Sequence, residues 1–588
     1  MTAHEPRTGK ARLVGRFLWH YAEMTIAMLL GMLLLGMVVP KTGRFGLDTL
    51  IMAANMTIGM SVWMAVRRHS RPRIAEMGLA MIVPFVILLV PYWFGAVSQM
   101  LVMSLGHTLM FVAMALVMVW RHEEYTHHHH KLPVRPKWIW RATVVLIALL
   151  PAAAISATNT IGRFADRYEA RTDHVTVDPT PKQHDPSKPT VAFVVGSKGA
   201  NVADLLGPYD VLAGTGRVNT YVVSAGARLV TLTGGLDIVP DMTFDELGQL
   251  LRNNGDKLDA VVIPAEQEMD ATELASVTGW IRRQYTDGAL TVSVCAGART
   301  LAATGLLDGR PATSHWLRLS GLQNDFPKVN WERGVRYVDD GNIITAAGVL
   351  SGVDGGLRIL ERLTDADTAR QAANRVHWRY YSPGSSARIP ENSLQWADFV
   401  APLNTSYQTG PTTVGVQLVD GTDELELASA FVSYTEQAMV ARTVAVGDAP
   451  IRSKHGLTFV PRTKIAAAGD FERLLVPGLD AARQHAGAPG GEYLHQADEF
   501  AFDPVLRDIA RTYDVATAHF AAKTLEYPVM DVQLTGQDWP WGPTIVPIAL
   551  ILVSAGVAIT GGIVFRRIRA KSAPAPTIPA PMGELVHS

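Results

Sequence analysis

The sequence predicts an integral membrane protein with α/β domains outside the bilayer, and three observations point to this. Five apolar stretches occupy the first 160 residues and a sixth lies near the carboxyl end, each close to the ~20 residues that cross a bilayer. Between them, residues 162–538 alternate apolar runs with amphipathic stretches broken by Gly, Asp and Pro, as in soluble α/β structure. The 53 basic and 54 acidic residues leave no excess charge to attract nucleic acid, so we expect no such partner.

The apolar stretches predict a membrane part of about six helices, in contact with the lipid bilayer. These spans are expected at 17–39, 50–66, 77–96, 100–120 and 138–158, which form a five-helix transmembrane domain over 17–158, and at 543–565. Lys and Arg gather before the first span, after the second, after the fourth and after the sixth, and such an excess marks cytoplasmic loops.

This charge pattern predicts the topology. The ends at 1–16 and 566–588 are expected in the cytoplasm, and residues 159–540 outside the cell. The first apolar run is too long for a signal peptide and no small-residue cleavage site follows it, so it is expected to be retained. Residues 159–189 are expected to form a linker, exposed over 163–188 because few of its residues are apolar.

The chain has one cysteine, Cys295, which excludes internal disulfides and Cys-rich metal sites. It directly follows an apolar strand at 290–294 and precedes a helix of small residues. A nucleophile on such a strand-to-helix turn stands at the carboxyl edge of a sheet, where the positive end of the helix favours a thiolate. The alternative is an inert buried cysteine, but the position at a strand end favours a reactive thiol.

Three segments carry a resemblance to a known family. They are DLLGPYDVL at 204–212, SVCAGARTLAATGLLDGRPATSHW at 293–316 and DGNIITAAGVLSGVDGGLRILERL at 340–363. They resemble the DJ-1/PfpI (ThiJ) superfamily of class I glutamine-amidotransferase-like domains, nearest to isonitrile hydratase and to the sensor domains of AraC-type regulators. The resemblance implies an α/β flavodoxin-like sandwich, which we bound at 190–392.

The resemblance also implies roles for two side chains beside the catalytic Cys295. The family's acidic residue that hydrogen-bonds the cysteine sulfur falls on Asp204, where a protonated carboxyl would stabilise the thiolate and act as general acid. A helix N-cap is an alternative for Asp204, compatible with that role. His315 matches the family's His in ATxHW, as a base or orienting group, and a structural histidine is the alternative.

The chain departs from the family pattern around the expected oxyanion hole. The usual Gly-Gly after the third strand is Ala265–Glu266, and a carboxylate there opposes a developing oxyanion. Residue 296 is Ala where peptidase-like members have His and hydratases have Thr, which disfavours proteolysis by a Cys–His pair. With Gly297, these residues are the expected oxyanion or pocket positions.

Residues 412–431 and 441–478 echo the first strands of the 190–392 domain, so we expect a degenerate second lobe over 393–538. Glu426 falls near the place of Asp204, but no apolar elbow strand and no cysteine follow residue 478. The second lobe is therefore unable to perform thiol chemistry. We expect it to pair with the first lobe within one chain, or the chain to form a homo-oligomer, and residues 500–528 to be helical.

Methionines recur every four residues in the predicted spans, which aligns their thioethers in stripes suited to Cu(I). Met24, Met28, Met56, Met60 and His107 are the candidate ligands, and adaptable packing between helices is the alternative. A histidine-rich run at 122–130 could hold Zn or Ni weakly, or be a solvated tract. No resident metal and no cofactor are otherwise expected.

Three functions remain open from the sequence. In the first, the Cys295 thiolate adds to an electrophilic carbon of an unknown small molecule with Asp204 as acid and base, giving a hydratase, hydrolase or lyase. In the second, the same site senses a ligand or the oxidation of Cys295 without catalysis. In the third, the membrane helices carry a transport or scaffold role, linked to copper.

Overall fold

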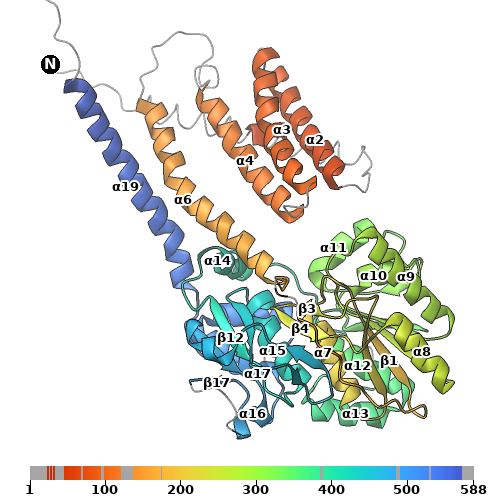
Figure 1. Ribbon diagram of the computed structural model, residues 1–588. Helices are drawn as coiled ribbons and strands as arrows, with labels where there is room; N and C mark the ends of the chain where they lie inside the picture. The colour runs from red at the N-terminus through yellow and green to blue at the C-terminus, as the bar shows by residue number, and fades with distance from the viewer. Residues whose placement is uncertain are drawn as a thin grey trace, which may run out of the picture. The chain divides into compact units, whose positions relative to one another are not determined.

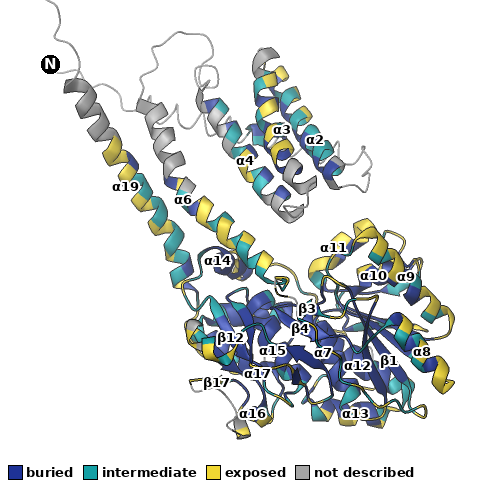
Figure 2. Ribbon diagram, in the orientation of Figure 1, coloured by how far each residue is buried: buried dark blue, intermediate teal, exposed yellow. Residues whose placement is uncertain are grey.

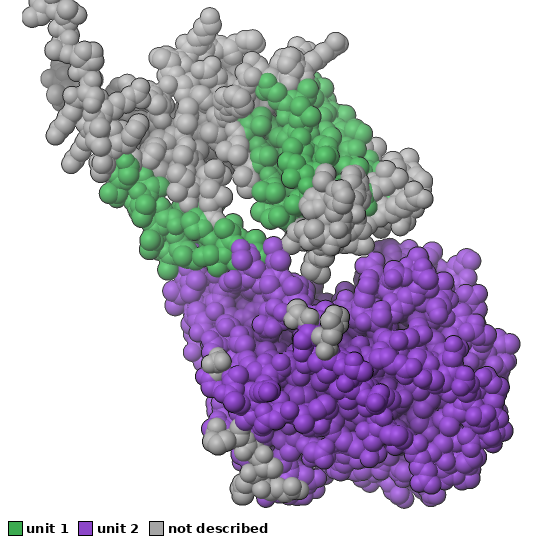
Figure 3. Space-filling model, in the orientation of Figure 1, with its two compact units in different colours: residues 1–157, 549–588 green, residues 158–548 purple. Residues whose placement is uncertain are grey.

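The computed structural model describes residues 23–25, 27–28, 31–32, 45–67, 71–93, 99–120, 137–171, 173, 175–383, 388–484, 490–528 and 532–571. The chain divides into two compact units, coloured separately in Figure 3. The first unit comprises residues 1–157 and 549–588, and the second comprises residues 158–548.

Long helices occupy the places of the second to sixth predicted spans. They are α2 (Phe45–Val66), α3 (Arg71–Trp93), α4 (Gln99–Trp120), α6 (Lys137–Asp166) and α19 (Trp541–Lys571). Two stretches of described helix, Asp48–Val66 and Trp541–Gly561, are long and apolar enough to cross a membrane, and Ile74–Leu89 is apolar over a shorter length. Within the described residues there are therefore two candidate spans rather than six; most of the expected span 17–39 lies outside them.

Methionine side chains fill the core of the first unit. Ten of them are fully or almost fully buried in one cluster with Ala53 and Phe85: Met24, Met28, Met56, Met60, Met64, Met77, Met81, Met110, Met114 and Met118. A Cβ on Gly31 would lie 2.6 Å from Cα of Gly59, so these two glycines let two helix backbones approach closely.

A seven-stranded sheet forms the first lobe of the second unit (Figure 1). Its order is β10-β11-β7-β6-β1-β2-β5, and all neighbours are parallel except β10 and β11. The strands are β1 (Thr190–Val195), β2 (Asn219–Ser224), β5 (Met242–Thr243), β6 (Ala260–Ile263), β7 (Leu290–Val294), β10 (Tyr337–Asp340) and β11 (Ile343–Ala346). The predicted elbow strand before Cys295 is confirmed as β7.

Helices cover both faces of this sheet, which confirms the predicted α/β architecture. One face packs against α7 (Val202–Ala213), α12 (Ser351–Leu363) and α13 (Ala366–Arg375), and the other against α8 (Phe244–Asn254), α9 (Ala271–Thr286) and α10 (Gly297–Ala303). The central strands β1 and β6 are buried along their whole length, as expected for parallel strands covered on both sides. The short strands β8 (Pro311–Ala312) and β9 (Asn330–Trp331) flank α11 (Trp316–Asp325).

The second lobe repeats part of this topology. Its sheet has the order β13-β12-β16-β17 with all neighbours parallel, which parallels the order β2-β1-β6-β7 of the first lobe. The strands are β12 (Thr413–Gln417), β13 (Arg442–Val446), β16 (Arg473–Val476) and β17 (Glu492–Tyr493). A short strand, β17, thus stands in the place of β7, although the sequence shows no apolar run there.

Helices complete the second lobe. They are α15 (Glu424–Val432), the one-turn helix η2 (Ser433–Gln437), η3 (Ile465–Asp470), α16 (Leu479–Gln484), α17 (Phe502–Thr512) and α18 (Val515–Thr524). The last two confirm the helical expectation for residues 500–528.

The two lobes share one core. Strand β4 (Leu236–Val239) of the first lobe pairs antiparallel with β15 (Thr458–Val460) of the second, and β3 (Val230–Leu232) and β14 (Ile451–Arg452) complete a four-stranded sheet. Helix α7 packs against α15, and a single cluster of buried apolar residues runs through both lobes (Figure 2). Across the β4–β15 pair, Arg462 Nη2 donates to Asp237 Oδ1 at 2.7 Å and its Nε to Oδ2 at 2.9 Å.

Part of the segment 163–188, which is expected to be an exposed linker, makes contacts with both lobes. Arg171 Nη1 donates a hydrogen bond to the carbonyl of Pro461 in the second lobe. Lys182 Nζ donates to Asp241 at 2.6 Å and to the Tyr209 hydroxyl at 2.8 Å in the first lobe. Both side chains are 12 % exposed. The segment is poor in apolar residues, but its charged side chains find buried partners in both lobes, which the composition does not reveal.

We expect Asp237→Ala to destabilise the full chain by about 3 kcal/mol, because it leaves the guanidinium of Arg462 buried at the lobe junction without its carboxylate. Thermal unfolding of the purified chain, followed by intrinsic fluorescence, measures the effect. Asp308→Ala is the control, because Asp308 forms an exposed pair with Lys328 and its loss should cost less than about 1 kcal/mol. Equal melting temperatures for the two variants would contradict the junction role of Asp237.

Candidate functional site

Cys295 stands on a strained turn between β7 and α10. Its φ is 56°, a left-handed conformation that a residue with a Cβ adopts rarely, and its N–H donates to the carbonyl of Ala346 on β11 at 3.0 Å. The Ser314 hydroxyl donates to the Cys295 carbonyl at 2.7 Å. The turn is therefore fixed from two sides, and the cysteine is only 8 % exposed.

Gly297 lets the helix after the turn approach the sheet. A Cβ at this position would lie 2.1 Å from the carbonyl oxygen of Ile263 and 2.6 Å from that of Pro264. Real Cβ atoms do not come so close to a backbone oxygen, so only glycine fits beside the end of β6. The expected pocket residue Gly297 thus acts by shaping the turn.

Asp204 lies in the first turn of α7, completely buried. The N-cap alternative is wrong, because Asn201 caps α7 and accepts from the N–H groups of Ala203 and Asp204 itself. Oδ2 of Asp204 accepts from the Ala265 N–H at 3.2 Å. Its Oδ1 is buried with no hydrogen-bond partner in the described part of the chain, which leaves one carboxyl oxygen available at the site.

Burial raises the pKa values of both members of the Asp204–Cys295 pair. For Asp204, burial and then the charge of Glu436 outweigh the Ala265 N–H and the Cys295 thiol, which act to lower its pKa. For Cys295, burial and then Asp204 raise the pKa well above its usual value, although the Ala296 N–H favours the thiolate. Burial and the neighbouring Asp204 therefore oppose the thiolate that the position at the start of the short helix α10 is expected to favour.

The second lobe and the end of α6 contribute charges that the sequence did not assign to the site. Glu436, on η2, accepts from Asn201 Nδ2 at 2.8 Å, and its charge acts on both Asp204 and Cys295. Arg167 and Tyr168 directly follow α6 and also lie within electrostatic reach of Glu436, and Tyr168 Oη accepts from Thr233 at 3.1 Å. No local motif marks these residues, because they lie 127 to 141 positions from Cys295 along the chain.

The expected oxyanion positions are already engaged. The Ala265 N–H donates to Asp204, and the Ala296 N–H interacts with the Cys295 sulfur. The carboxyl of Glu266 accepts from the Gly196 N–H at 2.7 Å, and burial raises its pKa well above the usual value. Glu266 is therefore held by the backbone at the end of β1, and its burial opposes the charged form.

His315 is directed to the second lobe. Its Nε2 lies 2.8 Å from the carbonyl oxygen of Thr524, to which a neutral imidazole donates from this nitrogen. Burial lowers the pKa of His315 to about 4, so the ring is uncharged at neutral pH. The observed contacts fit the structural alternative for His315 as a bridge between the lobes.

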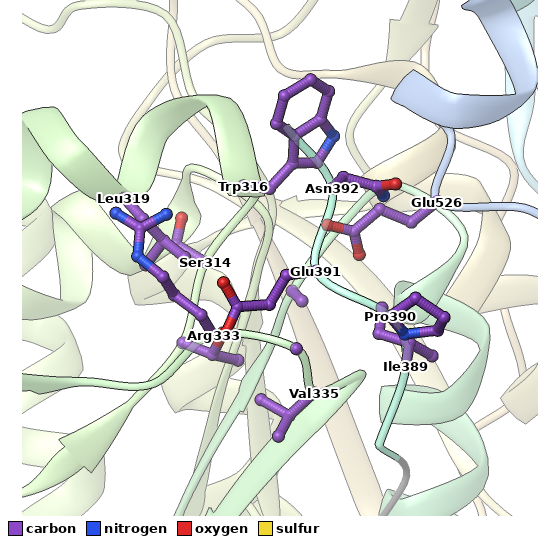
Figure 4. Close-up of a pocket in the computed structure, with 13 residues that line it drawn as sticks. Ser314, Trp316, Leu319, Arg333, Val335, Ile389, Pro390, Glu391, Asn392 and Glu526 are labelled. Atoms are coloured by element: carbon purple, nitrogen blue, oxygen red, sulfur yellow. The ribbon is translucent and has the colours of Figure 1, made fainter. Parts of the chain in front are cut away.

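A small pocket lies beside the turn (Figure 4). Ser314, Trp316, Arg333, Glu391 and Asn392 line it together with Glu526 from the second lobe, and its free volume of about 20 Å³ accommodates a water molecule. Cys295 is not among the lining residues. In this conformation the pocket therefore holds no organic substrate against the sulfur.

The second lobe has a histidine at the position of the cysteine. The equivalence follows from the strand registers. Leu475 of β16 pairs with Glu492 of β17, and Val262 of β6 pairs with Val292 of β7. His495 lies three residues after Glu492, and Cys295 lies three residues after Val292. Glu426 Oε1 accepts from the Leu479 N–H at 2.7 Å, much as Asp204 accepts from Ala265. His495 is buried and its pKa is lowered to about 4, so this site is a neutral, hydrogen-bonded core.

The candidate metal ligands of the first unit lie in its apolar core. Met24, Met28, Met56 and Met60 are buried among other methionines, and packing accounts for their position. His107 Nδ1 lies 2.6 Å from the carbonyl oxygen of Met103. The histidine run at 122–130 lies outside the described residues.

A second group of possible metal ligands lies between the lobes, where single ligand atoms of Asp210, Asp423 and His455 fall within 4.8 Å of one another. Arg375 and Lys454 already pair with the two carboxylates. The group is therefore better described as an ion-pair cluster.

Comparisons with known proteins agree with this geometry. The model of the DJ-1/PfpI family matches residues 189–362. The chain is 33 % identical over 170 residues to isonitrile hydratase of Pseudomonas putida, covering 28 % of this chain and 69 % of that protein. It is 28 % identical over 149 residues to the deglycase PfpI of Pyrococcus furiosus, which covers 24 % of this chain and 81 % of that protein. It is 26 % identical over 151 residues to the HTH-type transcriptional regulator GbdR of Pseudomonas aeruginosa, which covers 26 % of this chain and 39 % of that protein.

We expect Gly297→Ala to destabilise the chain by about 2–3 kcal/mol, because the added methyl group would meet the backbone at the end of β6. The melting temperature of the purified chain measures this. Gly321→Ala in α11 serves as control, since a Cβ there meets nothing within 4 Å and should be neutral or slightly stabilising. A Gly297 variant as stable as this control would refute the close approach.

We expect Glu436→Gln to lower the pKa of Cys295, because the charge of Glu436 raises it. The glutamine can still accept from Asn201. Alkylation of the single cysteine by iodoacetamide, followed by mass spectrometry across pH, should then be faster at a given pH, by about ten-fold for each unit of pKa lost. Arg318→Gln should act in the opposite direction, because the charge of Arg318 lowers the same pKa. Two variants that shift the profile in the same direction would contradict this electrostatic account.

Proposed function

The chain belongs to the DJ-1/PfpI family, and from this premise we propose that its Cys295–Asp204 site is a sensor rather than a turnover enzyme. The observation that carries the proposal is that Glu436 of the second lobe accepts from Asn201 beside the site and that its charge acts on both Asp204 and Cys295. A change in charge at the sulfur would therefore act on Glu436, whose charge also acts on Arg167 and Tyr168 just after α6. The relative GbdR is a transcriptional regulator by name, and a regulatory role for this chain is compatible with that similarity.

Several features argue against rapid nucleophilic catalysis in this conformation. Burial raises the pKa of the Cys295 thiol, the Ala265 N–H is engaged by Asp204, and His315 contacts Thr524. An enzyme of this type needs an activated sulfur and free N–H donors for the developing oxyanion. A sensor needs neither, because a slow single event at the sulfur is sufficient.

The event that we propose is oxidation of Cys295 by a peroxide, which the burial of the sulfur and the raised pKa of its thiol make slow. The sulfur attacks one peroxide oxygen, the O–O bond breaks, and the leaving hydroxide takes up the thiol proton, so thiol and hydrogen peroxide give sulfenic acid and water. The unpartnered Oδ1 of Asp204 can accept from the new hydroxyl. The added oxygen needs space next to Glu436, and we expect it to push η2 and residues 167–168 away.

We propose that this signal is passed to a membrane part. The expected arrangement is a multi-pass cell-membrane protein with both termini in the cytoplasm and residues 159–540 outside. The apolar stretches Asp48–Val66 and Trp541–Gly561 and the basic loops support it. Because α6 ends directly before Arg167, a displacement at the cysteine site would reach a predicted span within the same helix.

Hydrogen–deuterium exchange of the full chain tests the sensor. After treatment with hydrogen peroxide, segments 163–170 and 433–437 should exchange faster than in the reduced chain, and Cys295→Ser should abolish the difference. Mass spectrometry of the peptide with Cys295 verifies the oxidation. Complete oxidation without any change in these two segments would refute the proposed signal.

A cysteine-dependent hydratase, hydrolase or lyase is the second candidate function, favoured by the 33 % identity to isonitrile hydratase. We expect no multiple turnover of an alkyl isonitrile or of a 2-oxoaldehyde by the purified chain, because the sulfur is buried and its burial raises the pKa of the thiol. Product formation by gas or liquid chromatography measures this. Turnover that persists for many cycles and disappears in both Cys295→Ser and Asp204→Asn would overturn the sensor and establish the enzyme.

A further inference from the structure

Exposed apolar side chains of the second unit are concentrated in three segments. Among the described residues of 158–548, the large apolar side chains with substantial exposure are Ile161, Leu317, Leu394, Trp396, Phe399, Trp541, Ile545 and Ile548. All except Leu317 lie at the end of α6, in residues 394–399, or at the start of α19. Trp396 is the extreme case, at 92 % exposed.

These three segments meet at one place in the second unit. Helix α14 (Val400–Tyr407) contacts the end of α6, because Asn159 Nδ2 donates to the Ser406 carbonyl at 2.8 Å (Figure 1). Trp539, just before α19, packs on the cluster of Val400, Ala401 and Phe520. The exposed residues before α14 are thus continuous with both helices that connect the second unit to the first.

The exposed side chains are held in place by a well-packed support. They lie on and before η1 (Trp396–Phe399), a 3₁₀ turn whose Asp398 is buried and accepts from the Gln395 N–H at 2.7 Å and from Lys523 Nζ at 2.6 Å. Residues three apart lie on the same side of a 3₁₀ turn, so Trp396 and Phe399 project together. Their exposure therefore follows from the fold of η1.

We propose that Leu394, Trp396 and Phe399 form a membrane-contact surface that seats the second unit in the lipid interface. Tryptophan is favoured at the headgroup level, where its ring is apolar and its N–H remains hydrated. Trp541 and Ile545 are exposed at the start of α19, just after Trp539, which packs on Val400 and Ala401, and the stretch Trp541–Gly561 is apolar enough to cross a bilayer. This inference rests on the proposed membrane anchoring and adds a contact that would fix the distance of the cysteine site from the bilayer.

Fluorescence quenching in reconstituted membranes tests the surface. The starting variant is the chain with Cys295→Ser, which has no cysteine. Trp396→Cys adds a single cysteine, which is labelled with the fluorophore bimane. The labelled protein is reconstituted into phosphatidylcholine nanodiscs whose acyl chains either carry bromine or do not. Two matched positions accompany it: Leu552→Cys in α19, which reports anchoring, and Asp367→Cys on α13, whose side chain is 76 % exposed and outside the proposed surface.

We expect bromine to reduce the emission at positions 396 and 552 by about two-fold or more and to leave position 367 unchanged. Quenching at 552 without quenching at 396 would overturn the membrane-contact surface and leave the anchoring intact. Absence of quenching at 552 would overturn the anchoring itself. Cross-linking between chains through position 396 in detergent, with no quenching in lipid, would show that a second copy covers the surface and would also overturn the proposal.

Discussion

The pairing of β4 with β15 is the interaction on which the rest of the second unit depends. It joins strands from two lobes into one sheet, and Asp237 and Arg462 close this junction with two hydrogen bonds. Because the lobes are joined there, α7 packs on α15 and the apolar core continues from one lobe into the other. The burial of the cysteine site and the position of Glu436 both follow from this junction.

Burial then decides the chemistry of the site. A thiol at the start of a helix gains from the helix dipole, but that gain is typically below ~1 kcal/mol at exposed sites and is smaller still for a short helix. Removing a charge from water costs more, and the neighbouring carboxyls of Asp204 and Glu436 add like charge. The same residues that make a reactive elbow in an open site therefore give a buried thiol with a raised pKa in this one.

The two lobes show how one backbone arrangement serves two purposes. At equivalent places after the parallel strands, the first lobe has Cys295 with Asp204 and the second has His495 with Glu426. The second pair uses its hydrogen bonds to hold the loops at 478–479 and 501. Its loss of thiol chemistry leaves the second lobe to act through contacts, above all Glu436 on the first site and Thr524 on His315.

The sequence by itself determined the features that depend on neighbouring residues. The strand before Cys295, the helices at 500–528, the apolar stretches and the family resemblance all follow from local periodicity or contiguous motifs, and Asp204 followed from that resemblance. Only the tertiary structure decided the burial of Cys295, the partner of His315, and the positions of Arg167 and Glu436 within electrostatic reach of one another. These depend on burial and on charges brought together from positions more than one hundred residues apart, and no local pattern encodes such distances.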